Sequence, residues 1–302
     1  MAVENNQITL AEADYSTRRN TIAKLRRNMG LVVLTVVLLV FTMIVIVPFI
    51  WMTIMSFRTT TEILTAPYGL PTTLRWQNYA RLMFDPQIAF YRFFINSVFV
   101  TFFALIFTVI LSTLGGYGFG RSRYNFKFRG WLFVLLLFAL MLPPQIMYIP
   151  QFTMMSRYGL LNSRWSLVLL YTASALPVST YLMATYFSQL PTELEDAARI
   201  DGCNDFGMFW RVMVPLTRPA LATVILINGI HFWNELLLAV TMVTEPTKRT
   251  LPAAMMMFVG EHGSNYAIAA ASLVTAMLPV LILYLFLSDK FIEGLTAGAI
   301  KG

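Results

Sequence analysis

The sequence predicts an all-α integral membrane protein with six transmembrane helices, and three observations lead to this prediction. Hydrophobic residues make up 57% of the 302-residue chain and charged residues only 12%, whereas soluble domains average roughly 45–50% and roughly 25%. The mean hydropathy is +0.65. Several apolar segments reach the roughly 20 residues that a membrane-spanning helix needs. Together these features exclude a disordered chain and argue against a soluble globular enzyme.

Six segments meet the length and hydropathy requirement. They are residues 31–56, 95–119, 131–155, 165–187, 219–243 and 267–287. The third is interrupted by Pro143, Pro144 and Pro150, and the fourth and sixth contain Pro177 and Pro279. Each proline removes a backbone hydrogen bond. Broken helices line many transport sites, and kinked packing helices are also common, so both interpretations stay open.

The basic residues predict the orientation of the spans. The formal net charge is +7. The Lys and Arg residues lie at the ends of the apolar spans, a distribution that membrane topology explains and that nucleic-acid binding does not require. Two clusters stand out: Arg18, Arg19, Lys24, Arg26 and Arg27 before span one, and Arg121, Arg123, Lys127 and Arg129 between spans two and three. The longer loop between spans one and two is poorer in Lys and Arg for its length. We therefore expect both termini in the cytoplasm.

This orientation divides the chain into three parts. Residues 1–30 are expected to form a cytoplasmic tail, residues 31–290 the membrane domain and residues 291–302 a second cytoplasmic tail. The apolar spacing of Ile22, Leu25 and Met29 suits a short helix on the membrane surface, with a partly disordered tail as the alternative.

The cytoplasmic loop between spans four and five, residues 189–217, is the most informative stretch. Thr192 and Glu195 fit a capping box at a helix start, and Gly202 fits a left-handed residue at the helix end. Asn204 or Asp205 can cap a second helix, which Pro215 is expected to end. The predicted faces are Leu194, Ala197, Ala198 and Asp201 for close contact with another surface, and Phe206, Phe209, Trp210 and Met213 for packing on the membrane domain. A generic helical hairpin is the alternative.

The same loop resembles a known family. The loop contains Asp196-Ala197-Ala198, then Gly202 after three residues, then Val212-Met213-Val214-Pro215 after nine more. This pattern resembles the signature E-A-A, Gly, I-x-L-P of permease subunits of ATP-driven, binding-protein-dependent importers. Asp196, Val212 and Val214 depart conservatively from it. The runs Ala-Arg-Ile-Asp201-Gly202, His231-Phe-Trp-Asn-Glu235 and Arg249-Thr-Leu-Pro252 are similar to the carbohydrate-uptake branch, and to the second permease of maltose- and trehalose-type systems. The resemblance covers about residues 31–302.

The resemblance implies a fold, a mechanism and a set of partners. The fold is the six-helix ABC importer permease, in a bacterial or archaeal cytoplasmic membrane. The loop carries a coupling helix that docks on a separate ATPase, and the implied docking residues are Glu193, Glu195, Asp196, Ala197, Ala198, Asp201 and Gly202. The implied partners are a second permease, two ATPase subunits, an extracytoplasmic sugar-binding protein and the lipid bilayer. ATP and Mg²⁺ belong to the ATPase. No G-x-x-x-x-G-K-[ST] occurs in this chain, so we expect no ATPase activity and no cofactor of its own.

Polar residues in span five are candidates for the substrate pathway. Asn228, His231 and Glu235 fall three and four residues apart on one predicted helix face, and Asn234 joins them. The alternatives are interhelical hydrogen bonds and a metal pair formed by His231 and Glu235. The glycine-rich run 115–120 follows an apolar helix, so close helix packing is a better interpretation than a nucleotide loop.

Two other classes of function require features of which the sequence has few or none. A self-contained secondary transporter driven by an ion gradient requires ionisable groups in several spans, and only His231 and Glu235 qualify. A membrane-embedded enzyme requires a clustered acid, base, nucleophile or metal site, which the sequence does not offer. Cys203 is the one cysteine, so no disulfide forms within the chain and a free, buried thiol is expected.

Overall fold

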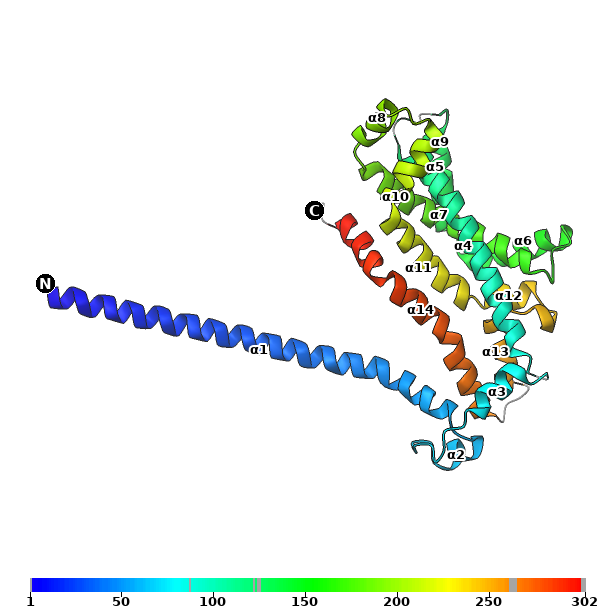
Figure 1. Cartoon of the computed structure of the whole chain (residues 1–302), viewed down its shortest axis with the longest axis horizontal. Coiled ribbons are helices and arrows are strands. Elements are labelled where there is room, and N and C mark those ends of the chain that lie inside the picture. The colour runs from blue at the N-terminus through cyan, green and yellow to red at the C-terminus, as the bar shows by residue number, and fades with distance from the viewer. Residues whose placement is uncertain (1, 87, 122, 124–125, 261–264, 300–302) are drawn as a thin grey trace. The chain divides into compact units, whose positions relative to one another are not determined.

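Figure 1 shows the computed structural model of the chain, which describes residues 2–86, 88–121, 123, 126–260 and 265–299. Within these ranges every regular element is a helix, as predicted. The chain forms two compact units, which divide between Ile54 and Met55.

The first unit is a single helix. Helix α1 spans Ala2–Ser56 and ends just inside the second unit. Its apolar part, Asn28–Ser56, is long enough to cross a membrane and agrees with predicted span one. One helix cannot bury its own side chains, so the exposed apolar run from Leu31 to Ile50 is available to lipid or to another protein.

The second unit contains the remaining helices. At one end lie α2 (Thr60–Thr65), α3 (Gln77–Phe84), η3 (Pro246–Lys248) and α13 (Leu251–Gly260). The long helices are α4 (Phe90–Gly120), α7 (Arg164–Gln189), α11 (Arg218–Asn234) and α14 (Tyr266–Ala299). Beside them lie α5 (Arg129–Phe138), η1 (Ala139–Met141), α6 (Pro144–Arg157) and α12 (Leu237–Met242). The other end carries α8 (Glu193–Ile200), α9 (Asp205–Met208), the π-helical turn η2 (Phe209–Met213) and α10 (Val214–Leu216).

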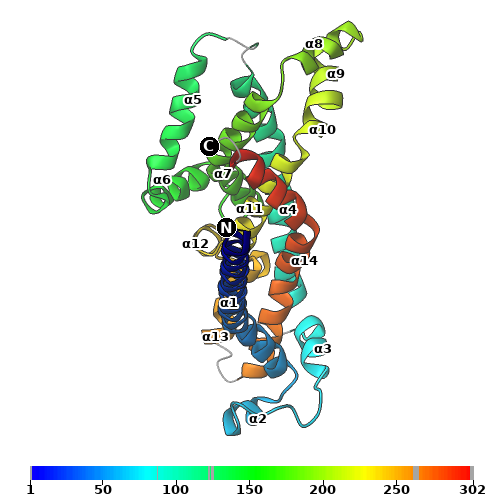
Figure 2. The same cartoon turned by 90° about the vertical axis from the view of Figure 1, so that its left-hand side faces the viewer.

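Helices α4 and α7 form the central pair, with α11 against both and α14 against α11 (Figures 1 and 2). Glycines in the predicted run 115–120 allow this close approach. A Cβ built on Gly116 would lie 2.4 Å from the Cβ of Met183, and one on Gly120 would lie 2.5 Å from the carbonyl oxygen of Ala184. The packing interpretation of this run is confirmed.

The described residues contain four continuous helices and two bent segments that are long and apolar enough to cross a membrane. Among the described residues, parts of α1, α4, α7 and α14 are long and apolar enough to cross a membrane. Predicted span three bends by 104° between η1 and α6, at Pro143 and Pro144, so the predicted interruption is confirmed there. Pro150, Pro177 and Pro279 lie inside helices that continue past them.

Predicted span five is wrong as a single helix. Helix α11 ends at Asn234, Glu235 has extended dihedral angles, and α12 begins at Leu237. By length and composition, α11 instead forms a bent pair with the preceding segment Asp205–Leu216, at an angle of 72°. The apolar run 219–243 is therefore divided by a break in the backbone.

The two ends of the second unit differ in structure (Figure 1). At the α2–α3 end, Arg58 is 1% exposed and donates to the carbonyl oxygens of Glu62, Ala66 and Pro67. The Thr59 amide and the Thr72 hydroxyl donate to the Glu62 carboxylate, and these hydrogen bonds lower the pKa of Glu62 to about 2. The opposite end is the loop between α7 and α11.

Candidate functional site

The loop between α7 and α11 folds as the predicted helical hairpin. Helix α8 ends in a Schellman motif, in which the Cys203 amide donates to the Ala198 carbonyl and the Gly202 amide to the Arg199 carbonyl, both at 2.9 Å. Gly202 has φ +81°, as its predicted left-handed role requires. The Asn204 side chain then caps α9 by accepting from the Gly207 amide at 2.7 Å.

The predicted end of the second helix is corrected. The chain remains helical through Pro215 to Leu216, with the π-helical turn η2 directly before it. A proline removes one backbone donor and crowds the carbonyl four residues earlier, and the widened turn provides the space. The helix ends at Leu216, and Thr217 separates it from α11, which begins at Arg218.

The predicted capping box at Thr192 is also wrong. Thr192 has helical dihedral angles and makes no side-chain cap. Glu195 is 2% exposed and turns away from the helix start, into the protein. Its Oε1 accepts from Arg121 Nε at 2.8 Å and from the Tyr117 hydroxyl at 3.1 Å. Glu195 is therefore not part of the exposed surface of α8.

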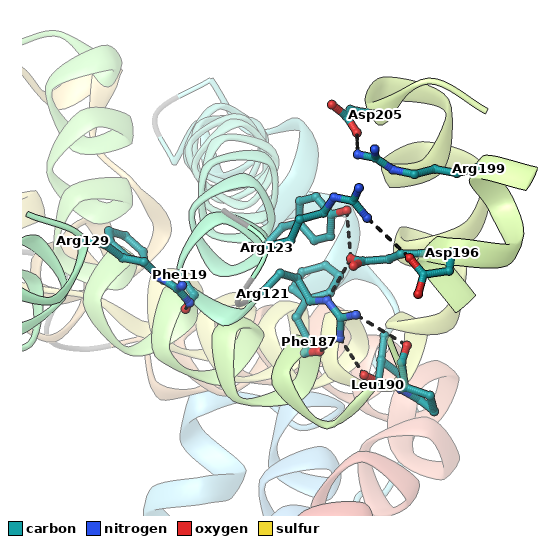
Figure 3. Close-up of polar contacts among 12 residues, drawn as sticks. Phe119, Arg121, Arg123, Arg129, Phe187, Leu190, Asp196, Arg199 and Asp205 are labelled. Carbon is teal, nitrogen blue, oxygen red and sulfur yellow. Dashed lines mark hydrogen bonds and ion pairs between the residues drawn. The ribbon is translucent and has the colours of Figure 1, made fainter. Parts of the chain in front are cut away.

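Arg121 makes further contacts at the end of α7 (Figure 3). Its Nη1 donates to the carbonyl oxygens of Phe187 at 3.0 Å and Leu190 at 2.6 Å, and its Nη2 approaches the Pro191 carbonyl at 3.5 Å. The last carbonyls of a helix have no partner within the helix. One guanidinium thus joins the end of α4, the end of α7 and the side of α8.

The exposed surface of the loop differs from the predicted faces. Ala198 is 6% exposed and packs with Met208, Phe209 and Met213 against α4, α7 and α11. Phe206 is 73% exposed and Trp210 42% exposed, so only half of the predicted packing face is buried. We call seven exposed residues the loop surface: Glu193, Asp196, Ala197, Ile200, Asp201, Gly202 and Phe206; Arg199, Asn204, Asp205 and Trp210 beside them are exposed as well.

The predicted pathway residues do not form one patch. Asn228 is 8% exposed and its side-chain amide donates to Ser179 Oγ at 2.9 Å and to the Val224 carbonyl at 2.8 Å. His231 and Asn234 are exposed, and the Asn234 amide donates to the Ile230 carbonyl. The pairing of Asn228 with α7 agrees with the interhelical alternative, whereas the pathway role stays a prediction for His231 and Asn234.

Glu235 lies at the break between α11 and α12. Its carboxylate accepts from the Tyr171 hydroxyl at 2.8 Å and from the backbone amides of Leu238 and Ala239 at 2.8 and 3.1 Å. These bonds satisfy the free donors at the start of α12. The carboxylate therefore stabilises the break, and the predicted face shared by Asn228, His231 and Glu235 does not extend past Asn234.

The side-chain partners of Glu195 and Glu235 were not predicted from the sequence. By sequence, Arg121 is one of several basic residues in a cytoplasmic loop, and Tyr117 is part of a glycine-rich run. The available signal was position, since an arginine that directly follows a long apolar helix can reach back to helix ends nearby. No sequence signal connected Tyr171 with Glu235.

Comparisons with known proteins agree with the resemblance found in this loop. Residues 112–294 match the family described as "Binding-protein-dependent transport system inner membrane component". The diacetylchitobiose uptake system permease protein NgcG of Streptomyces coelicolor is 33% identical over 266 residues, which cover 87% of each chain. The trehalose/maltose transport system permease protein MalG of Thermococcus litoralis is 33% identical over 258 residues, covering 84% of this chain and 91% of that protein.

A solved structure supports the same relationship. One chain of a bacterial ABC transporter involved in the import of the acidic polysaccharide alginate has a TM-score of 0.75 and 26% identity, covering 88% of this chain and 97% of that chain. This likeness confirms the coarser prediction, an all-helical ABC permease fold. The chain belongs to the family of inner-membrane components of binding-protein-dependent transport systems and is an ABC transporter permease subunit, not an enzyme.

Proposed function

We propose that this chain is the permease subunit of an ATP-driven, binding-protein-dependent importer of a carbohydrate. The two relatives are named for diacetylchitobiose and for trehalose or maltose, and the solved transporter for alginate. These substrates share sugar chemistry but differ in charge and size. The proposal therefore concerns the class of carbohydrate and not one sugar.

The observation that carries the proposal is the loop surface, which extends over α8 and the start of α9. It presents three carboxylates, on Glu193, Asp196 and Asp201, beside the apolar side chains of Ile200 and Phe206, which are 87% and 73% exposed. Exposed apolar patches with a polar rim mark protein–protein interaction sites, and the proposal assigns this role to Ile200 and Phe206. An ATPase subunit with basic and apolar residues in a groove is the complementary partner.

The proposed mechanism gives each partner a separate task. Two ATPase subunits bind ATP and Mg²⁺, and their closure displaces α8. The permease helices then open to the other side, where a sugar-binding protein delivers the substrate. In this arrangement the α8 end and both termini face the cytoplasm, and the α2–α3 end faces the binding protein.

A second permease is needed to complete the pathway. Apolar side chains on the outside of the second unit include Trp131, Met141, Ile149 and Phe286, all more than three-quarters exposed. Lipid covers part of such a surface, and the second permease covers the rest. Family membership gives no support to the alternative of a self-contained secondary transporter.

Co-expression with a candidate ATPase, a second permease and a sugar-binding protein from the same organism tests the proposal. A tag on this chain is expected to retain the ATPase during purification. In liposomes, ATP hydrolysis is then measured with diacetylchitobiose, maltose, trehalose and alginate oligosaccharides as separate probes, together with the binding protein. Stimulation by a carbohydrate supports the proposal, and a purified chain that never retains the ATPase contradicts it.

A further inference from the structure

We propose that Arg121, Glu195 and Tyr117 form a clasp that makes α8 and the cytoplasmic end of α4 move as one body. The inference rests on the proposed function, because it assigns a task to these residues during coupling. They are positioning residues, since they lie behind the docking surface and do not contact the substrate.

The clasp is a desolvated ion pair. Arg121 is 3% exposed and Glu195 2% exposed, and Nε lies 2.8 Å from Oε1. The Tyr117 hydroxyl donates to the same oxygen at 3.1 Å. Charge-assisted hydrogen bonds are about twice as strong as neutral ones, and removal of one partner leaves an uncompensated buried charge. Relative displacement of α4 and α8 is therefore costly.

The same arginine extends the connection to α7. Its Nη1 bonds to the Phe187 and Leu190 carbonyls hold the residues that lead directly into α8. Helices α4 and α7 are already packed closely through Gly116 and Gly120. A displacement applied to α8 is thus transferred to two long helices through one guanidinium.

Packing alone does not account for this arrangement. The apolar cluster beneath α8 and η2 already buries Ala198, Met208, Phe209 and Met213. Replacing a buried ion pair by apolar residues is often neutral or stabilising, so a pair that serves only stability is dispensable. An ion pair with fixed hydrogen-bond directions, however, defines the position of α8 more strictly than non-directional apolar contacts do.

Exposed ion pairs in the same loop provide a contrast. Arg199 contacts Asp205 at 2.6 Å with 40% and 62% exposure, and Arg123 approaches Asp196 at 3.7 Å with 35% and 69% exposure. Exposed pairs contribute little, because water and salt screen them. Arg123→Gln is therefore a matched control, which removes an arginine pairing with α8 but leaves the clasp intact.

Spin-label distances in the assembled transporter test the clasp. Cys203 is replaced by Ser, and labels are attached at Leu114→Cys on α4 and Arg199→Cys on α8, both exposed positions. The complex with its ATPase is measured without nucleotide and with a non-hydrolysable ATP analogue. In the background with the intact clasp and in Arg123→Gln, we expect the same distance distribution in both states. In Glu195→Gln, we expect a broader distribution whose mean shifts when the analogue binds, with the ATPase still attached.

Two results would overturn the clasp. One is a distance that shifts on nucleotide binding while the clasp is intact, and the other is a Glu195→Gln complex that behaves like the background. If Glu195→Gln fails to assemble, the intact-clasp measurement still decides, and Tyr117→Phe is expected to show a smaller shift. Failure of the proposed function is distinct, because the ATPase would then be absent from the unlabelled complex.

Discussion

The side-chain amide of Asn228 donates a hydrogen bond to Ser179 Oγ at 2.9 Å, which joins α11 to α7 inside the second unit. Three residues later, His231 is exposed on the same helix. Two polar residues that share a predicted face thus have different surroundings. The side-chain amide of Asn228 forms hydrogen bonds within the protein, whereas His231 is available to a partner or a substrate.

This difference predicts opposite phenotypes for two alanine variants. Asn228→Ala leaves Ser179 without its partner and is expected to cost about 1 kcal/mol, a typical value for an interhelical hydrogen bond in a membrane protein. His231→Ala is expected to alter sugar-stimulated ATP hydrolysis without lowering the thermal unfolding temperature. Thermal unfolding in detergent and hydrolysis in liposomes measure the two effects. Normal activity and normal stability in His231→Ala would remove His231 from the pathway.

The glycine run in α4 predicts substitutions with opposite signs. Gly116→Ala places a Cβ 2.4 Å from the Met183 Cβ and 2.9 Å from the Ala184 nitrogen, so α4 and α7 must separate, at a typical overpacking cost of about 1–3 kcal/mol. Gly118→Ala has no atom within 4 Å and should gain roughly 0.5–1 kcal/mol from helix propensity. Thermal unfolding of the two variants compares them directly. A stabilised Gly116→Ala would contradict the close packing.

The proposed orientation predicts which positions a membrane-impermeant thiol reagent can reach. In a Cys203→Ser background, Asp205→Cys is expected to react only after the cells are permeabilised. Phe84→Cys, at the opposite end of the second unit and 83% exposed in the native side chain, is expected to react in intact cells. Labelling of position 205 from outside intact cells would invert the orientation.

The turn after α8 predicts strong discrimination among substitutions at Gly202. Its φ of +81° costs an L-residue roughly 1–2 kcal/mol, and a β-branched side chain tolerates it least. A Cβ there meets nothing within 4 Å, so the effect comes from the backbone. Gly202→Val is expected to release the ATPase or uncouple hydrolysis from transport, whereas Gly202→Asn, which accepts left-handed angles more readily, should retain more activity. Co-purification and coupled hydrolysis distinguish them, and equal function in both variants would show that the turn geometry is not needed.

The T-x-x-E pattern shows how far local sequence can determine structure. It occurs at Thr59–Glu62 and at Thr192–Glu195. The first forms a capping box, with both reciprocal hydrogen bonds present. At the second, Glu195 instead forms a buried ion pair with Arg121, which is distant in sequence. The Gly202 turn and the Asn204 cap could be predicted because their physics is local, whereas the predicted capping box failed because the contacts of Glu195 depend on tertiary structure.

The break at Glu235 could not be predicted for a similar reason. Residues 219–243 include the polar residues His231, Asn234 and Glu235, but no proline follows Pro219 in the run to mark where the helix breaks. A break in a span is stable only where its free backbone groups find partners, and here Glu235 supplies them for Leu238 and Ala239. By contrast, Pro143 and Pro144 limit the backbone by themselves, so the bend in span three could be predicted.

Photocrosslinking from two equally exposed positions tests the central claim most directly. A benzophenone amino acid replaces Ile200 on α8 or Phe84 in α3, whose native side chains are 87% and 83% exposed at opposite ends of the second unit. In the assembled transporter, we expect position 200 to crosslink to the ATPase subunit and position 84 not to. Crosslinking of the ATPase from position 84 and not from position 200 would contradict the docking of the ATPase on α8.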